Sequence, residues 1–113
     1  MKVLIVEDDA VSRKMIEILM KPLVDKCDLA KDGLIAKEFF NKAVDNGDRY
    51  DLVLLDIMLP GMDGQTLLQE FRKKETQHGI LGNKKSKILM VSALSDAGNI
   101  MEAFKNQCDG YLT

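Results

Sequence analysis

The chain has little of what several classes of binding site require. It contains two cysteines, Cys27 and Cys108, which form no CxxC pair and have no histidine beside them, so a zinc site is not expected. No apolar stretch is long enough to span a bilayer. The short apolar run at 3–6 is followed at once by three acidic residues, which is unlike a signal peptide. These absences predict a cytoplasmic protein.

The charge balance and the missing glycine-rich motifs narrow the range of partners. A net charge of −2 argues against nucleic acid as a direct partner. The sequence contains neither GxxxxGK[ST] nor GxGxxG after any apolar run, so a nucleotide-binding loop of those types is not expected. The length of 113 residues, with 46% apolar and 30% charged residues, fits one globular domain with one core.

Short apolar runs alternate with segments of helical spacing, and the runs are apolar throughout rather than at every second residue. Runs of this kind are typical of parallel strands buried on both faces. The alternation therefore predicts an α/β fold with helices on both faces of a parallel sheet. The expected strands are 3–6, 27–30, 52–55, 87–91 and 111–113; the expected helices are 11–20, 35–43, 64–74 and a segment through Ile100, Ala103 and Phe104.

Helix starts and one loop complete this outline. Asp32 and Asp63 are expected to cap the second and third helices, and Ser95 or Asp96 to cap the fourth. Segment 75–86 is predicted to be a solvated loop. The alternative is a partner contact through Ile80 and Leu81 within that segment.

Three carboxylates follow two of the expected strands. Asp8 and Asp9 close the first apolar run and Asp56 closes the third. Ligands bind at the carboxyl ends of strands in open α/β sheets, so these side chains are expected to meet there. At about 5 Å and an effective dielectric of about 20, each pair of carboxylates costs roughly 3 kcal/mol. A hard divalent cation would offset this repulsion.

Each of these residues also has an ordinary structural interpretation. Asp8 could cap the first helix, and Asp56 could be a loop or helix-entry residue. Ser92 could likewise be a plain cap, and Tyr111 a strand aromatic. What favours a functional site is that all four are expected at one edge of the sheet.

Four motifs in this order resemble a response-regulator receiver domain of two-component signalling, similar to the bacterial chemotaxis regulator. The motifs are Glu7-Asp8-Asp9, Asp56 with Pro60 and Gly64, Ser92-Ala93, and Tyr111. The resemblance covers residues 1–113 as one receiver domain. It implies a flavodoxin-like, doubly wound sheet of five parallel strands in the order 2-1-3-4-5.

The resemblance also implies a function and a ligand set. Asp56 would accept a phosphoryl group from a histidine kinase or phosphotransfer protein. Asp9, Asp56 and the backbone carbonyl of Met58 would bind Mg²⁺ directly, and Asp8 through a water. Ser92 and Tyr111 would switch the surface of helix four and strand five toward a downstream domain or protein. Such a domain catalyses only its own phosphorylation and dephosphorylation and is not otherwise an enzyme.

Two rival functions are weighed against this one. The first is a receiver-like interaction module that is not phosphorylated. The second is a phosphatase with an aspartyl nucleophile, which typically carries a second Asp two residues after the first. Met58 stands at that position, so the expected general acid is missing.

The sequence departs from the family pattern at its end. The family has a Lys-Pro pair just after strand five and then a last helix, whereas this chain stops at Thr113. Without that lysine, the charges of Asp8, Asp9, Mg²⁺ and a doubly charged acyl phosphate sum to about −2. With the lysine, the sum would be about −1. We therefore expect a truncated receiver whose phosphorylated state is poorly stabilised, or one whose open sheet face is covered by a second chain.

Overall fold

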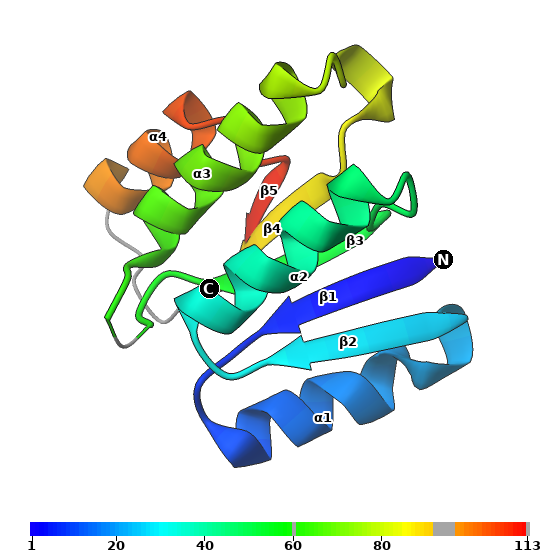
Figure 1. Cartoon of the computed structure of the whole chain (residues 1–113). Helices are drawn as coiled ribbons and strands as arrows, with labels where there is room; N and C mark the ends of the chain where they lie inside the picture. The colour runs from blue at the N-terminus through cyan, green and yellow to red at the C-terminus, as the bar shows by residue number, and fades with distance from the viewer. Residues whose placement is uncertain (60, 92–96, 113) are drawn as a thin grey trace.

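The structure, a computed structural model, describes residues 1–59, 61–91 and 97–112. Within these residues, strands and helices alternate along the chain (Figure 1). The strands are β1 (Lys2–Val6), β2 (Lys26–Ala30), β3 (Leu52–Asp56), β4 (Lys87–Val91) and β5 (Gly110–Leu112). The α-helices are α1 (Ala10–Met20), α2 (Gly33–Asp45), α3 (Gly64–Gln77) and α4 (Ala97–Lys105), with short 3-10 turns at Lys21–Leu23 and Gly82–Lys84. None of the described helices is both long and apolar enough to cross a bilayer.

The five strands form one parallel sheet in the order β2-β1-β3-β4-β5. This confirms the α/β class and the strand order expected from the sequence. The 113 residues end with strand five and do not include the last helix of the family pattern. The order reverses between β1 and β3, and such a reversal opens a crevice at the carboxyl ends of the two strands.

Three helices begin at an aspartate that caps them. Asp9, Asp32 and Asp63 each accept a hydrogen bond from the backbone N–H three residues later, at 2.8, 2.9 and 2.9 Å. These bonds satisfy donors that a helix leaves unpaired at its first turn. The expected caps Asp32 and Asp63 are confirmed, whereas α1 is capped by Asp9 rather than Asp8. The two expected caps of the fourth helix lie outside the described residues.

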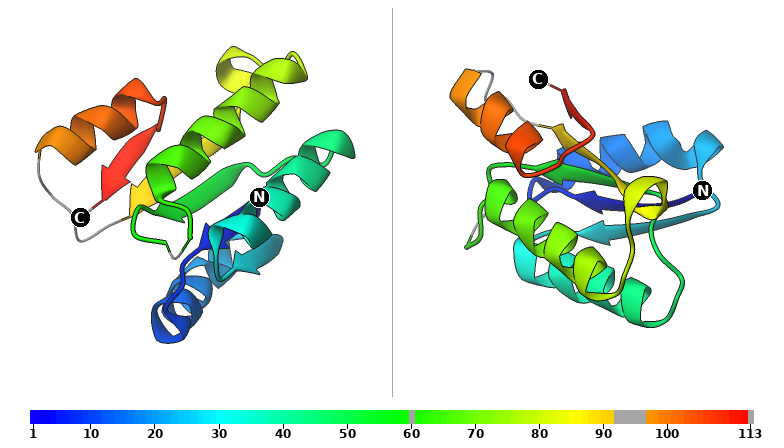
Figure 2. Two further views of the ribbon diagram at one scale, coloured as in Figure 1. Left: turned by 60° about the vertical axis from the view of Figure 1, so that its left-hand side comes forward. Right: turned by 90° about the horizontal axis from the view of Figure 1, so that it is seen from above.

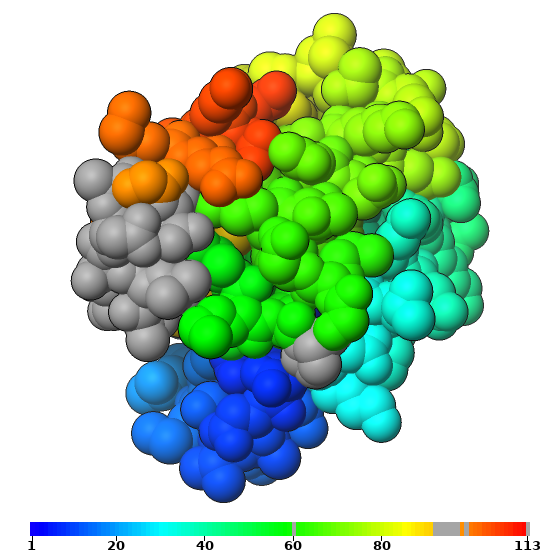
Figure 3. Space-filling view, turned by 90° about the vertical axis from the view of Figure 1, so that its left-hand side faces the viewer, coloured from blue at the N-terminus to red at the C-terminus, as the bar shows by residue number. Residues whose placement is uncertain are grey.

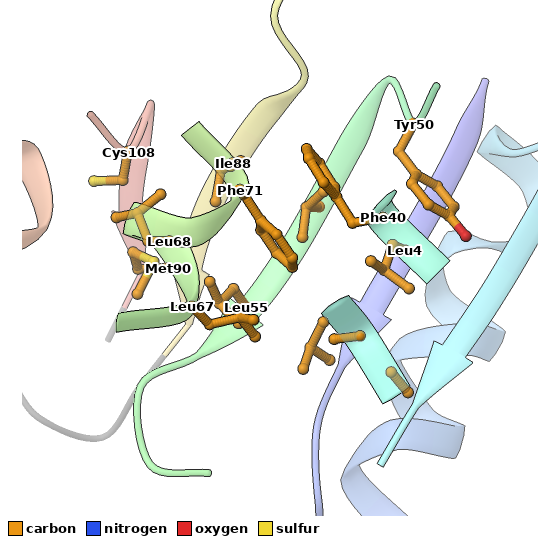
Figure 4. Close-up of a cluster of buried hydrophobic side chains, with 14 of the residues drawn as sticks. Leu4, Phe40, Tyr50, Leu55, Leu67, Leu68, Phe71, Ile88, Met90 and Cys108 are labelled. Atoms are coloured by element: carbon orange, nitrogen blue, oxygen red, sulfur yellow. The ribbon is translucent and has the colours of Figure 1, made fainter. Parts of the chain in front are cut away.

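Helices cover both faces of the sheet, as Figure 2 shows. The larger core cluster lies under α2, α3 and α4, where the rings of Phe40 and Phe71 stack with centroids 4.2 Å apart (Figure 4). The opposite face carries a smaller cluster of Val3, Ile5 and Leu54, packed against α1. The two clusters hold the strands, and therefore the ends of the strands, in fixed positions.

A buried ionic network ties α3 to the segment between α4 and β5. The Arg72 guanidinium donates to Glu75 at 2.7 Å, to Asp109 at 2.9 Å and to the carbonyl oxygens of Ser86 and Gln107 at 2.8 and 2.9 Å. Glu75 is fully buried, and its second oxygen accepts the backbone N–H of Ser86 at 2.8 Å. The network therefore fixes the entry to β4 and β5 against α3.

This network corrects the expectation of a solvated loop over 75–86 at the two ends of the segment, whereas residues 81–84 between them are exposed as expected. Helix α3 continues to Gln77 rather than ending at residue 74, and both Glu75 and Ser86 are buried. Glu75 carries a charge, and charged side chains are usually exposed. Glu75 pairs with Arg72 one turn earlier on α3, and the N–H of Ser86 and the carboxylate of Asp109, which complete the network, come from distant segments that only the tertiary fold brings close.

We expect Arg72→Met to lower the free energy of unfolding by about 3–5 kcal/mol, because it leaves Glu75 buried without its cationic partner. The double variant Arg72→Met/Glu75→Met should lose less than the sum of the two single variants, since the two residues are in contact. Urea denaturation followed by circular dichroism measures both. Lys73→Gln, an exposed neighbour on α3, is the control and should change stability by less than about 0.5 kcal/mol. A similar value for Arg72→Met would contradict the assignment.

Candidate functional site

The site lies where β1 and β3 end side by side. Val6 pairs with Leu55 in the parallel register. Glu7 and Asp56 are therefore the residues that follow this pair along β1 and β3. Figure 3 views this edge of the molecule, where the segments that follow β1 (blue) and β3 (green) meet. The parallel pairing alone thus brings two acidic residues together that are separated by almost half the sequence.

Three carboxylates form a cluster at this edge. Among the described residues, Glu7, Asp8 and Asp56 form a group whose ligand oxygens lie within 4.8 Å of one another. Glu7 and Asp56 are half-buried and Asp8 is exposed. The cluster therefore opens to solvent on one side, where an ion or a phosphoryl group could enter.

The electrostatic cost of this cluster falls on Glu7. Burial, together with the charges of Asp56 and Asp8 and a hydrogen bond to Asp56, raises the pKa of Glu7 to about 7 from an ordinary value of 4.5. Partial compensation comes from the backbone N–H of Asp9, which donates to the Glu7 carboxylate at 3.1 Å. At neutral pH the cluster thus holds more negative charge than its surroundings stabilise.

Asp9 lies outside the cluster, which corrects the expectation that it meets Asp8 and Asp56. Helix α1 begins at Ala10, so Asp9 is its cap, and the carboxylate accepts the backbone N–H of Ser12 at 2.8 Å. The side chain of Ser12 and then this backbone N–H lower the pKa of Asp9. Glu7 takes the place in the cluster that the sequence assigned to Asp9. A run of three acidic residues does not reveal which of them turns inward.

Arg13 holds the acidic segment from the helix side. Its guanidinium donates to the backbone carbonyl of Glu7 at 2.8 Å and to that of Asp8 at 3.3 Å. These bonds leave the carboxylates of Glu7 and Asp8 to the cluster. Sequence reasoning did not assign this role to Arg13, because the bonds are made to the backbone and depend on how the chain enters α1.

The loop after Asp56 is held close to β3. The Met58 N–H donates to a carboxylate oxygen of Asp56 at 3.0 Å, and the Gly64 N–H donates to the Ile57 carbonyl at 2.7 Å. A Cβ atom on Gly64 would lie 2.4 Å from the Asp56 carbonyl oxygen, so any side chain there would displace the backbone of Asp56. Pro60, expected in the same loop, lies outside the described residues.

Only one of the two expected switch residues lies among the residues that the structure describes. Ser92 lies outside the described residues. Tyr111 lies in β5, where it pairs in register with Met90 and packs, half-buried, against the larger core cluster. The switch role of both residues stays a prediction.

The chemistry of the cluster fits Mg²⁺. Three carboxylates offer only oxygen ligands, which Mg²⁺ and Ca²⁺ prefer. Mg²⁺ keeps several waters and needs few protein ligands, in agreement with the solvent-open side of the cluster. A cation would also offset the charges of Asp56 and Asp8, which add to the larger effect of burial in raising the pKa of Glu7.

Comparison with known proteins assigns the family. The chain matches the response regulator receiver domain over residues 3–113. It is 37% identical over 112 residues to the regulatory protein VanRB of Enterococcus faecalis, covering 99% of this chain and 44% of that protein. The chain therefore belongs to the response regulator receiver domain family of two-component signalling. It spans less than half the length of the curated relatives that it matches.

Solved structures support the fold. The receiver domain of the Arabidopsis thaliana histidine kinase CKI1, complexed with Mg²⁺ and BeF₃⁻, superposes with a TM-score of 0.86 at 24% identity, covering 98% of this chain and 78% of that one. The receiver domain of the Francisella response regulator 1452 gives a TM-score of 0.77 at 29% identity, with 99% and 82% covered.

Glu7 predicts how stability depends on pH without divalent ions. Its pKa is about 7 in the folded chain against 4.5 when unfolded, so between these values the folded protein binds more protons. The free energy of unfolding should therefore fall as pH rises from about 4.5 to about 7, and this fall should be absent in Glu7→Gln. Urea denaturation in EDTA across that range measures it. Glu38→Gln, an exposed carboxylate on α2, should keep the parent's slope. A Glu7→Gln protein with the parent's slope would contradict the assignment.

Proposed function

We propose that this receiver domain accepts a phosphoryl group on Asp56 and uses it to signal to a partner. The observation that carries the proposal is the cluster of Glu7, Asp8 and Asp56 at the β1–β3 crevice. Membership of the receiver family supports the same assignment. The donor would be a sensor histidine kinase or a phosphotransfer protein, and the receiving partner a downstream output domain or protein.

Asp56 would act as the nucleophile. One of its carboxylate oxygens attacks the phosphorus atom of a phosphohistidine; a P–O bond forms, the P–N bond breaks, and the imidazole nitrogen leaves with the electron pair. A carboxylate has no proton to lose, so this step needs no general base. The Met58 N–H, which donates to Asp56, would fix the orientation of the carboxylate.

Glu7, Asp8 and Asp56 would hold Mg²⁺, with the backbone carbonyl of Met58 as a further ligand. When bound, the ion would neutralise negative charge on the phosphoryl oxygens during transfer and in the product. Asp9, proposed as a direct ligand from the sequence, would instead act through α1. Its capping bond fixes the residue that follows Asp8, so it would position Asp8.

The output would travel through the α4–β5 side of the molecule. An acyl phosphate adds a group of about −1.5 to −2 charge with strong acceptor oxygens, which is enough to bias a loop between two arrangements. Ser92 would donate its hydroxyl to the phosphoryl group, and Tyr111 would change its position in response.

We expect acetyl phosphate with Mg²⁺ to add one phosphoryl group to the chain, and Asp56→Asn to abolish the addition. Intact-protein mass spectrometry measures it, and omission of Mg²⁺ should also prevent it. Asp63→Asn is the matched control, since it removes a carboxylate that caps α3 outside the cluster and asparagine caps equally well. An unmodified parent protein would instead favour the alternative function, an interaction module that is not phosphorylated.

The ligand set has its own test. Glu7→Gln and Asp8→Asn should each weaken Mg²⁺ binding by roughly tenfold or more, since even loss of a residue that only supports a ligand costs 10–100-fold. Asp9→Asn should stay within about twofold of the parent, because asparagine keeps the cap of α1. Calorimetric Mg²⁺ titration provides the affinities. A large loss in Asp9→Asn, with Glu7→Gln unchanged, would restore the ligand set expected from the sequence.

A further inference from the structure

A second charged region lies at the opposite end of the strands, where β1, β3 and β4 begin. A pocket of about 700 Å³ opens there, between the turn before β3 and the turn before β4. Its lining includes five cationic side chains and two carboxylates: Lys2, Arg49, Lys84, Lys85, Lys87, Asp48 and Asp51. This region, called the basic pocket below, carries a positive excess although the whole chain has a net charge of −2.

Existing contacts engage both carboxylates of the basic pocket. The Lys2 ammonium lies 3.1 Å from a carboxylate oxygen of Asp48 and also donates to the Asp48 carbonyl at 2.6 Å. The backbone N–H of Lys2 donates to the Asp51 carboxylate at 2.7 Å. Lys2 and Asp48 thus pair with each other, and Asp51 is bound to the start of β1.

The other cations are not matched in this way. Arg49 donates to the backbone carbonyl of Lys84, and Lys85 donates to the neutral side-chain oxygen of Gln107 at 3.0 Å. Among the described residues, neither the Lys84 nor the Lys87 side chain takes part in an ion pair or hydrogen bond. The basic pocket thus holds four cationic side chains that have no acidic partner in the described part of the chain, those of Arg49, Lys84, Lys85 and Lys87. Within that same part, Asp51 is the one carboxylate of its lining that is not paired with a lysine side chain.

The shape and charge of the basic pocket indicate the class of ligand. The rim has room for a chain of linked anionic groups rather than one small ion. Arginine binds phosphate through paired N–H donors, and lysine acts as a point charge beside it. The backbone N–H groups of Lys85 and Lys87 already donate to the carbonyls of Gly82 and Asp51, so a ligand would be bound by side chains. Binding of this kind would not require a glycine-rich loop.

We propose that the basic pocket binds the polyphosphate group of a small ligand, such as inorganic triphosphate or a nucleoside triphosphate. Arg49, Lys84, Lys85 and Lys87 form the contacts. The site lies at the opposite end of the strands from Asp56, so binding does not depend on phosphorylation. Lys84 and Lys87 are exposed and Arg49 and Lys85 are half-buried, so solvent reaches the contacts and added salt weakens the binding.

The experiment titrates the chain with inorganic triphosphate at low salt and without divalent ions, followed by amide NMR shifts. We expect saturable shifts centred on residues 49 and 84–87, and a weaker affinity when salt is raised. Lys84→Gln/Lys87→Gln should weaken binding at least tenfold. Lys73→Gln/Lys105→Gln removes the same charge from α3 and α4 and should leave the affinity within twofold. Unchanged amide spectra away from the substitutions show that each variant is folded.

Adenosine triphosphate, titrated in parallel, separates the two sources of the polyphosphate group. Equal affinities mean that the phosphate chain alone is recognised, and tighter binding of the nucleotide means that the nucleoside adds contacts. The proposal is overturned if neither compound saturates, if both double variants lose affinity equally, or if the shifts centre on residues 7, 8 and 56. Asp56→Asn should bind triphosphate as the parent does, so failure of phosphorylation and failure of this proposal give different results.

Discussion

The parallel pairing of β1 with β3 is the constraint on which the site depends. The register that sets Val6 beside Leu55 places Glu7 and Asp56 at the same level, one residue further along. Both strands are almost fully buried, so a slip of one residue would turn apolar side chains toward the wrong face of the sheet. The core therefore fixes the distance between the acidic residues, and the repulsion between them cannot relax by moving the strands apart.

Local features then keep the cluster compact. Gly64 allows the start of α3 to approach the backbone of Asp56, at a distance that no other residue would permit. On the other side, Arg13 draws in the carbonyls of Glu7 and Asp8. Burial, and after it the nearby charges of Asp56 and Asp8, raise the pKa of Glu7. The cluster therefore costs folding free energy at the position proposed for the cation and the phosphoryl group, and perturbed pKa values of this kind are common at functional sites.

The sequence was sufficient for the fold, because buried parallel strands leave short runs that are apolar throughout and the strand order follows from the family resemblance. The same runs placed Asp56 at the end of β3, and its role as phosphoryl acceptor stays a prediction. The sequence was not sufficient to choose between Glu7 and Asp9. Periodicity places the end of a strand only within a residue or two, and the cap that starts α1 is settled by packing. Nor did it reveal that Arg72 and Glu75 are buried, since their burial depends on Asp109 and on the backbone of Ser86, which come from distant segments.

The positions of the charged groups along the strand direction have a physical consequence. Glu7, Asp8 and Asp56 lie at one end of the strands, and the lysines and arginine of the basic pocket lie at the other. These groups contribute a dipole moment along the sheet of a chain whose net charge is only −2. In the field of a charged partner the molecule experiences a torque that turns one end toward that partner before any contact forms. Salt screens the field that produces this torque over about 10 Å. Ionic strength therefore changes the relative orientation in which this molecule and a charged partner meet, as well as the rate of their association.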